Sequence, residues 1–328
     1  MKKEIKQILI VRLSSLGDIL LTTPILRALK NKYNECEISF LCRKEYLSAV
    51  ETNLNIKNCF SLEIGVNEEE LSQKIQNFNF DMIIDLQNNL RSRNILKNLN
   101  IPIYKFKKPT IKKFLLVNFK LNFFKHYLSI PELYTKSIPG LELDDEGVDL
   151  FIPESLKTSL TSREKYIGFI PGSKHFSKRW PDEYFTQLGK LLNKYSYTIV
   201  LFGGKDDLEI CAKIATRITK VNNLCNDNDL YQTAVDMKMC SLIIGNDSGL
   251  MHVASSMFIP LIVLFGSSVE EFGFAPYRRE SVILQNDIIK CRPCSHFGKD
   301  ECPKRHFKCM IDLTPNLVFE KIKKVLSL

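Results

Sequence analysis

The sequence predicts an α/β protein of two domains, each with a parallel β-sheet flanked by helices. One observation is an apolar strand near the N-terminus, followed by a tight polar turn and a helix of apolar periodicity. The second is a segment of the same construction in the last third of the chain. Two such units favour two nucleotide-binding folds that face each other across a cleft. With 328 residues, 45% of them hydrophobic, the chain can form two cores.

The first half alternates short apolar strands with helical patterns, as parallel sheets do. The predicted strands are residues 8–13, 38–41, 59–64 and 82–86. A helix follows the first strand and another precedes the last. Pro, Ser, Thr and charged residues replace apolar ones at 153–164, so we place the N-terminal domain at 1–158.

The second half repeats the alternation and predicts a C-terminal domain over residues 159–314. Its expected strands are residues 166–170, 198–202 and 260–266, with a strand, turn and helix over 242–257. Helices are expected after Pro181, from about Asp207 and over 230–239. Residues 315–328 are expected to form a terminal helix.

The segment Asn246-Asp247-Ser248-Gly249-Leu250-Met251-His252 predicts a phosphate site. It follows a buried strand and opens a helix, whose first N–H groups lack partners and carry partial positive charge. Ser248 and Gly249 let the backbone approach a diphosphate, and Asp247 and His252 add an acceptor and a donor. An ordinary Asp-Ser helix cap is the alternative for this segment alone.

The net charge of +9 is concentrated in the middle of the first half. No acidic residue occurs between Leu86 and Pro131, and aromatic residues interleave with the cations. The cations are Arg91, Arg93, Lys97, Lys105, Lys107, Lys108, Lys112, Lys113, Lys120 and Lys125. Such a segment, 91–127, suits an anionic membrane surface or a phosphorylated lipid. Nucleic acid is the rival partner, and core aromatics with solvated lysines are the structural alternative.

The chain contains no apolar span of about 18 residues, so we expect a cytoplasmic protein. Six of its ten cysteines are scattered through apolar or helical contexts and fit reduced thiols. The other four, Cys291, Cys294, Cys302 and Cys309, lie close together in sequence. Four thiols can ligate a structural zinc. A reversible disulfide and free thiols remain the alternatives, because the gaps are not those of a standard zinc finger.

Three motifs together resemble the lipopolysaccharide heptosyltransferases of glycosyltransferase family 9. They are Ser14-Ser15-Leu16-Gly17-Asp18, then Pro171-Gly172-Ser173 with Lys178-Arg179-Trp180-Pro181, and Asn246 to His252 followed by Leu264-Phe265-Gly266. Each motif alone is weak, but their order and spacing along nearly the whole chain are specific.

The resemblance implies a GT-B fold of two Rossmann-like domains. It implies inverting, metal-independent transfer of heptose from ADP-heptose to the inner core of lipopolysaccharide, on Kdo- or heptose-bearing lipid A. The terminal helix would return to the N-terminal domain, and the enzyme would work beside the inner membrane. No nucleic-acid partner is expected.

Carried onto this chain, Asp18 becomes the general base and Lys178 contacts the donor phosphate or sugar. A carboxylate that accepts the attacking hydroxyl's proton contributes about 10²–10⁴-fold to the rate. A cation can offset charge on the departing diphosphate. A helix cap is the alternative for Asp18, and a solvated loop residue for Lys178. The implied donor site is Gly172, Ser173, Gly203, Asp206, Asp247, Ser248, Gly249 and His252, with Asp206 near the ribose.

Ser15, Gly17, Gln87 and Arg91 are the expected acceptor-binding residues. The last two follow the strand at Met82 and lead into the basic segment, where they could meet an acidic acceptor. Three other functions compete with the proposed one. A family 9 enzyme using another nucleotide sugar stays open. A nicotinamide dehydrogenase would need a glycine fingerprint, and the first turn has one glycine. A nucleic-acid-binding protein leaves the paired strand-turn-helix motifs unexplained.

Overall fold

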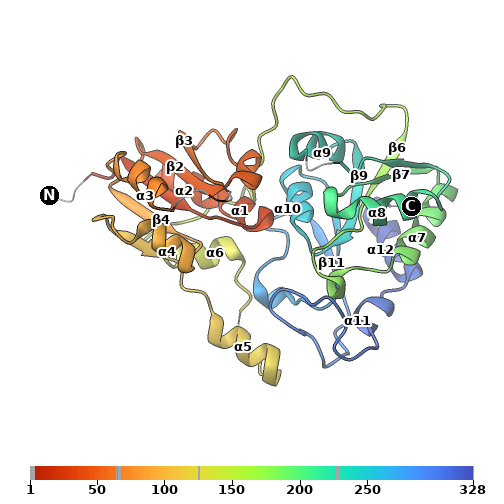
Figure 1. Cartoon of the computed structure of the whole chain (residues 1–328). Helices are drawn as coiled ribbons and strands as arrows, with labels where there is room; N and C mark the ends of the chain where they lie inside the picture. The colour runs from red at the N-terminus through yellow and green to blue at the C-terminus, as the bar shows by residue number, and fades with distance from the viewer. Residues whose placement is uncertain (1–3, 64, 66–67, 125, 227–228, 328) are drawn as a thin grey trace. The chain divides into compact units, whose positions relative to one another are not determined.

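The computed structural model describes residues 4–63, 65, 68–124, 126–226 and 229–327. The chain divides into two compact units. The first comprises residues 1–108 and 128–151, and the second comprises residues 109–127 and 152–328. Each unit has its own parallel sheet with helices against it (Figure 1). The predicted α/β class is confirmed for both units.

The sheet of the first unit has the strand order β3-β2-β1-β4-β5, and all its pairs are parallel. Its strands are β1 (Gln7–Val11), β2 (Glu37–Arg43), β3 (Asn58–Leu62), β4 (Met82–Asp85) and β5 (Ile103–Lys105). The helices are α1 (Leu16–Leu20), α2 (Thr23–Lys32), α3 (Glu68–Gln76), α4 (Leu90–Leu96) and α6 (Ile130–Thr135), with a 3₁₀ turn η1 (Lys44–Ala49). The four predicted strands are confirmed with small shifts at their ends, and residue 64 lies outside the described residues.

The central strand β1 explains why this sheet is parallel. Ile8, Leu9, Ile10 and Val11 are completely buried, so both faces of the strand are covered by other apolar elements. Continuous apolar runs of this kind are typical of strands sandwiched between helices. One face packs with Ile75 of α3 and Ile95 of α4.

The sheet of the second unit has the order β11-β10-β9-β6-β7-β8, again all parallel. Its strands are β6 (Lys165–Ile170), β7 (Tyr197–Leu201), β8 (Val221–Asn223), β9 (Cys240–Asn246), β10 (Leu261–Phe265) and β11 (Ser281–Gln285). Its helices are α5 (Thr110–Phe119), α7 (Asp182–Lys194), α8 (Leu208–Ala215), α9 (Leu230–Met237), α10 (Gly249–Ser256), α11 (Lys308–Ile311) and α12 (Pro315–Leu326). Short 3₁₀ turns are η2 (Phe176–Lys178), η3 (Lys205–Asp207) and η4 (Glu270–Phe272).

The segment 109–127, which contains α5, lies within the range predicted for the N-terminal domain but groups with the second unit. Its side chains explain the difference, because Lys120 donates to the carbonyl oxygen of Pro293 at 2.7 Å. Asn122 donates to Glu271 at 2.9 Å. Residues 152–158 also fall in the second unit, where Thr158 donates to Asp236 on α9 at 2.7 Å.

The predicted terminal helix is present as α12. It belongs to the second unit, where Val318, Phe319 and Ile322 pack in the same core as Trp180 and Leu188 of the α7 region. The indole N–H of Trp180 donates to the carbonyl oxygen of Leu313 just before α12, at 2.7 Å. The apolar face of α12 is therefore used within the second unit.

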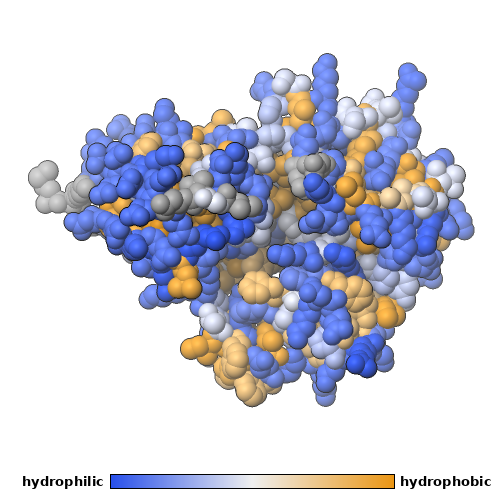
Figure 2. All heavy atoms as spheres, in the orientation of Figure 1, coloured by the Kyte–Doolittle hydropathy of each residue, from blue (hydrophilic) through white to orange (hydrophobic). Residues whose placement is uncertain are grey.

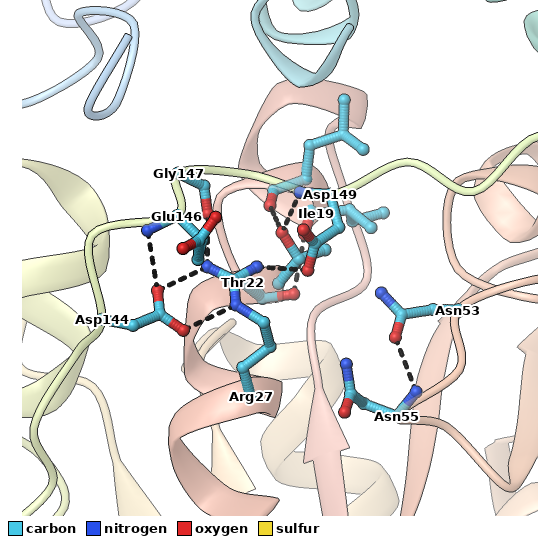
Figure 3. Close-up of polar contacts among 11 residues, drawn as sticks. Ile19, Thr22, Arg27, Asn53, Asn55, Asp144, Glu146, Gly147 and Asp149 are labelled. Atoms are coloured by element: carbon cyan, nitrogen blue, oxygen red, sulfur yellow. Dashed lines mark hydrogen bonds and ion pairs between the residues drawn. The ribbon is translucent and has the colours of Figure 1, made fainter. Parts of the chain in front are cut away.

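Arg27 on α2 fastens the segment that leads out of the first unit (Figure 3). Its guanidinium donates to both carboxylate oxygens of Asp144 at 2.7 Å and to the carbonyl oxygen of Gly147 at 2.7 Å. It also forms an ion pair with Asp149. The segment before Ile152 is thus bound to α2, the helix that follows α1 in the chain.

Candidate functional site

One candidate site, within the first unit, lies at the carboxyl end of β1 and β4. Along the sheet, chain connections run in opposite directions on the two sides of this pair, because β2 and β3 lie beyond β1 and β5 lies beyond β4. Open α/β sheets bind ligands at such a switch point. The loop after β1 carries Ser15, Gly17 and Asp18, and the loop after β4 carries Gln87. The sequence prediction therefore brought together residues from the two loops that topology makes neighbours.

Asp18 is held by a charged group and a hydroxyl. Its Oδ1 lies 2.5 Å from the guanidinium of Arg12, and its Oδ2 accepts from the Ser15 hydroxyl at 2.9 Å. The Asp18 side chain is 18% exposed, so one side of it still meets solvent. Asp18 is the third residue of α1, and the Ser15 N–H also donates to it at 3.3 Å. The Asp18 carboxylate therefore accepts hydrogen bonds from the N-cap residue Ser15, and the same carboxylate is the candidate base.

Gln87 is buried and supports the loop that carries Asp18. Its side-chain oxygen accepts from the N–H groups of Leu13 at 3.0 Å and Ser14 at 3.2 Å. Arg91 is exposed on α4, where its Nε donates to Glu68 of α3 at 3.2 Å. Gly17 is buried inside α1. Ser15, like Arg91, is exposed.

Two residues that sequence reasoning missed organise this site. Arg12 is 7% exposed and spans three groups, donating to the carbonyl oxygens of Ser14 at 2.9 Å and Leu86 at 2.8 Å besides pairing with Asp18. Asp85 accepts from the N–H of Gln87 at 3.1 Å and the hydroxyl of Ser92 at 2.8 Å. A charged residue at the end of a fully apolar strand is the signal that could have identified Arg12.

A second candidate site, within the second unit, has the same topological origin. Connections run in opposite directions on the two sides of the β6–β9 pair, since β7 and β8 lie beyond β6, and β10 and β11 lie beyond β9. The loop after β6 holds Gly172, Ser173 and Lys178. The loop after β9 holds Asp247 and Ser248 and runs directly into α10.

An ion pair joins these two loops. The Lys178 ammonium lies 2.7 Å from Oδ2 of Asp247, with side chains 16% and 8% exposed. Burial acts to raise the pKa of Asp247, but the charge and hydrogen bond of Lys178, together with smaller effects of Ser268 and His252, outweigh it, and the pKa lies below its usual value. The Ser173 hydroxyl donates to the carbonyl oxygen of Asp247 at 3.3 Å, which adds a second link.

The first turn of α10 matches the predicted anion site. Gly249 opens the helix, and Ser248 occupies the N-cap position without a side-chain hydrogen bond to the helix. The Ser248 hydroxyl is buried and has no hydrogen-bond partner among the described residues. His252 is 3% exposed and lies one turn further along. The ordinary Asp-Ser cap is therefore not formed, and the first N–H groups of α10 are left for a ligand or water.

Gly172 and Gly203 make room for Asp207. A Cβ on Gly172 would lie 2.0 Å from Oδ1 of Asp207, and a Cβ on Gly203 would lie 2.7 Å from its Cβ. Asp207 accepts from the N–H of Gly204 at 3.1 Å, and burial raises its pKa. The predicted ribose ligand Asp206 is exposed on the same turn.

Asn246 is a further residue that sequence reasoning did not single out. Its side chain accepts from the Trp180 N–H at 2.9 Å and donates to the carbonyl oxygen of Pro171 at 2.8 Å. It is completely buried. Asn246 therefore fixes the relative positions of the two loops that carry Lys178 and Asp247.

The four C-terminal thiols belong to the second unit and are all free. Cys291 Sγ lies 3.7 Å from Nε2 of His306, and Cys302 Sγ accepts from the Phe307 N–H at 3.4 Å. Burial raises the pKa of Cys309 to about 12 and also raises that of Cys294. Across the described residues, no three His, Cys, Asp or Glu side chains are grouped so that they could hold a metal ion. Zinc at these thiols stays a prediction from spacing.

In the part of the chain that the structure describes, none of the helices combines the length and the apolar character needed to span a bilayer.

Comparisons with known proteins agree with this geometry. The family model for glycosyltransferase family 9 (heptosyltransferase) matches residues 69–304. Lipooligosaccharide heptosyltransferase 2 of Campylobacter jejuni serotype O:2 is 28% identical over 95% of this chain and 96% of its own length. Lipopolysaccharide heptosyltransferase 2 of Salmonella typhimurium is 26% identical over 98% of this chain and 99% of its own.

Solved structures share the fold. A family 9 glycosyl transferase from Veillonella parvula aligns with a TM-score of 0.80 at 24% identity, covering 99% of this chain and 98% of its own. The Escherichia coli ADP-heptose lps heptosyltransferase II aligns with a TM-score of 0.76 at 22% identity, covering 98% of both chains. The two parallel sheets are those of the GT-B fold. By the family match and by its two strand-turn-helix loops, this chain belongs to glycosyltransferase family 9, the heptosyltransferases.

Proposed function

We propose that this protein transfers heptose from ADP-heptose to the inner core of lipopolysaccharide, on Kdo- or heptose-bearing lipid A. The names of its full-length relatives support this function. The observation that carries the proposal is the Lys178–Asp247 pair beside the open first turn of α10. Together they offer a cation, a hydroxyl and backbone N–H groups at one switch point, which is the set of donors a diphosphate needs.

The donor diphosphate is proposed to bind at the N-terminus of α10. The Ser248 hydroxyl and the first N–H groups of the helix donate to phosphate oxygens. Lys178 shifts part of its interaction from Asp247 to the phosphate as negative charge builds on the leaving ADP. Because fixed cations and dipoles can stabilise this charge, the chemistry does not require a metal.

Asp18 is proposed as the base. The acceptor hydroxyl oxygen attacks the anomeric carbon, the bond from that carbon to the phosphate oxygen breaks, and ADP leaves with the electron pair. Attack from the opposite face inverts the anomeric configuration. The acceptor proton passes to the carboxylate of Asp18, whose Oδ2 already accepts a hydroxyl hydrogen bond from Ser15 at 2.9 Å. Positioned carboxylates contribute about 10²–10⁴-fold in such steps.

The test of this mechanism is Asp18→Asn. We expect transfer to fall by at least about 10²-fold, while calorimetry gives donor affinity within a few fold of the wild type. Glu63→Gln, at an exposed carboxylate paired with Lys44, is the matched control and should leave both unchanged. Substantial turnover by the Asp18 variant would refute the base assignment.

Donor identity is tested separately with the same protein. Trp180 is the single tryptophan, and its backbone N–H bonds to Asn246 beside Asp247, so its emission should respond to a ligand at α10. Calorimetric titration should agree in affinity. Saturation by ADP-heptose but not by UDP-sugars is expected. Preference for another nucleotide sugar would keep the fold and mechanism and change the donor.

We also propose that the enzyme works at the cytoplasmic face of the inner membrane, because its acceptor is lipid-linked. The absence of acidic residues between Leu86 and Pro131 supports this location. Within the basic segment, Arg91 is paired with Glu68, and Arg93 donates to Asn88 at 3.0 Å. In the second half of the segment, from Pro109 onward, exposed apolar side chains lie among the lysines, and this composition favours a membrane; Lys125 lies outside the described residues.

A further inference from the structure

The helix α5 and the turn after it expose an unusual amount of apolar surface. Six large side chains on this segment are each more than half exposed. They are Ile111, Phe114, Phe119, Leu121, Phe123 and Tyr127. In Figure 2 orange side chains gather where Figure 1 labels α5. Monomeric soluble proteins rarely expose so many large apolar groups together unless the surface binds something.

Cations border these apolar groups. Lys112 is exposed, and its ammonium lies 5.9 Å from the centre of the Phe124 ring. Lys120 ends the helix in a left-handed conformation. No carboxylate exists on the segment itself. Apolar and aromatic side chains with lysines around them are the composition of an interfacial membrane-binding helix.

A second segment, distant in sequence, holds α5 in place. The Lys113 ammonium lies 5.2 Å from the ring centre of Phe272 and 5.5 Å from that of Phe274. Lys120 donates to the carbonyl oxygen of Pro293. The helix is therefore a fixed part of the second unit and presents a constant face.

The aromatic contacts continue from Phe272 to a second exposed ring. The Phe272 ring contacts His296 edge to face at 5.3 Å, and His296 contacts Phe297 at 5.6 Å. Phe297 is 73% exposed. The pKa of His296 is lowered to about 4 by burial and by Lys113, so this imidazole is neutral at pH 7. The ring contacts of Phe272 and His296 thus link the exposed Phe297 to Lys113 of α5.

We propose that α5 with its following turn, residues 110–127, and Phe297 form one docking surface for an anionic lipid bilayer. This inference deepens the proposed function, because it assigns membrane contact to the unit that carries the donor site rather than to the basic segment as a whole. Each lysine near anionic lipid contributes about 1 kcal/mol, and aromatic rings settle at headgroup depth.

Charge complementarity selects a bilayer over a second copy of the chain. A symmetric dimer through this face would place lysines opposite lysines, since residues 110–127 contain no acid and the neighbouring Glu271 already accepts a hydrogen bond from Asn122. An anionic lipid surface complements the lysines and accepts the apolar side chains between them. A soluble acidic protein would complement the lysines but not the exposed phenylalanines.

The test is sedimentation of the full-length protein with vesicles of phosphatidylcholine, with and without phosphatidylglycerol. We expect binding only to the anionic vesicles. Phe114→Ser and Phe297→Ser should each lower the partition coefficient about tenfold, because each removes an aromatic side chain from the interface. Lys112→Gln should lower it about fivefold. Leu54→Ser, at an apolar residue of the first unit that is 81% exposed, is the matched control and should change nothing.

Transfer to a short soluble acceptor separates this inference from the proposed function. All four variants should keep that activity and their melting temperatures, since exposed substitutions change stability by within about 0.5 kcal/mol. Equal binding to neutral vesicles, or no binding to either kind, would overturn the docking surface. Loss of binding in Phe114→Ser but not in Phe297→Ser would remove Phe297 from it. Self-association abolished by these variants would show that the occupant is a second copy.

Discussion

Arg12 and Asp18 form an ion pair of 2.5 Å across the turn that follows the first strand. The guanidinium uses its other N–H groups on the carbonyl oxygens of Ser14 and Leu86. The planar fork of arginine holds three acceptors from two loops in fixed directions, whereas the ammonium of lysine is a compact charge on a flexible stem. The ion pair with Arg12 and the hydrogen bonds from Ser15 at the start of α1 together orient the Asp18 carboxylate.

Arg12→Lys should lower kcat by about 10²-fold, since a shift of the base by about 1 Å has that effect. The KM for the nucleotide sugar should stay within a few fold, because the donor site lies in the other unit. Steady-state kinetics with both substrates check this split. A purely structural role for Arg12 predicts instead that activity per folded molecule is unchanged.

The Lys178–Asp247 pair should couple stability to donor binding. Lys178→Met leaves a buried carboxylate without its cation, which costs about 3–5 kcal/mol of unfolding free energy. Asp247→Asn in the same chain should restore most of that loss, but not donor affinity. Urea unfolding of the two single variants and the double variant gives the coupling energy. Additive losses would mean that the two side chains act independently.

The pH dependence of the same pair has a definite sign. In the wild type the pKa of Asp247 is lowered, so its contribution to stability is complete above the unfolded value of about 3.9 and is lost as pH falls through the folded value. In Lys178→Met burial, the largest cause, is opposed only by the smaller effects of Ser268 and His252 and should raise this pKa, so the variant should gain stability on acidification from neutral pH. Urea unfolding at pH 7 and pH 5 should show the difference between the two proteins shrinking. A constant difference would contradict the assignment.

Gln87 and Arg91 were predicted together as acceptor-binding residues. Because Gln87 is buried and Arg91 is exposed, substitutions at the two positions should change stability by different amounts. Gln87→Leu leaves the N–H groups of Leu13 and Ser14 without their acceptor, at a cost of about 1–3 kcal/mol. Gln87→Glu keeps the acceptor and should lose less. Arg91→Ala removes an exposed pair and should change stability by less than about 1 kcal/mol. Thermal unfolding and transfer assays on all three variants check these values.

His296 should make the second unit sensitive to mild acid. Its pKa of about 4 lies below the unfolded value of about 6.5, so between those limits only the unfolded chain binds the proton. The free energy of unfolding should fall as pH falls through this window. His296→Phe should remove that slope, and His126→Gln, at an exposed histidine, should keep it. Parallel slopes for all three proteins would disprove the assignment.

The zinc prediction from cysteine spacing is testable with metal and melting temperature. Thiolates must form before zinc binds, and the raised pKa of Cys309 and Cys294 means that binding releases protons. Zinc should raise the melting temperature of the wild type but should not change the melting temperature of Cys291→Ser. No bound metal and no thermal shift in the wild type would establish free thiols.

The sequence was sufficient for the elements whose signals are local. Fully apolar runs such as Ile8–Val11 predicted the central strands, and the turns after them located both candidate sites. Strands β5, β8 and β11 were missed because they are short or half-polar edge strands, which their neighbours stabilise more than their own residues do.

The rest depended on contacts between residues distant in sequence. Nothing within residues 109–127 indicates that Lys120 bonds to Pro293 or that the segment groups with the second unit. The role of Gln87 was also hidden, because its partners lie in another loop 73 and 74 residues away. The unused hydroxyl of Ser248 is visible only once the backbone of α10 is known.

The membership of α5 in the second unit has a consequence for protein synthesis. Lys120 precedes its partner Pro293 by 173 residues. At about 5–20 residues per second, the helix waits roughly ten seconds or more after translation before that partner exists. During this interval the nascent chain carries a cationic, aromatic segment with nothing to cover it. The ribosome-bound chain thus exposes this segment before the second unit has folded.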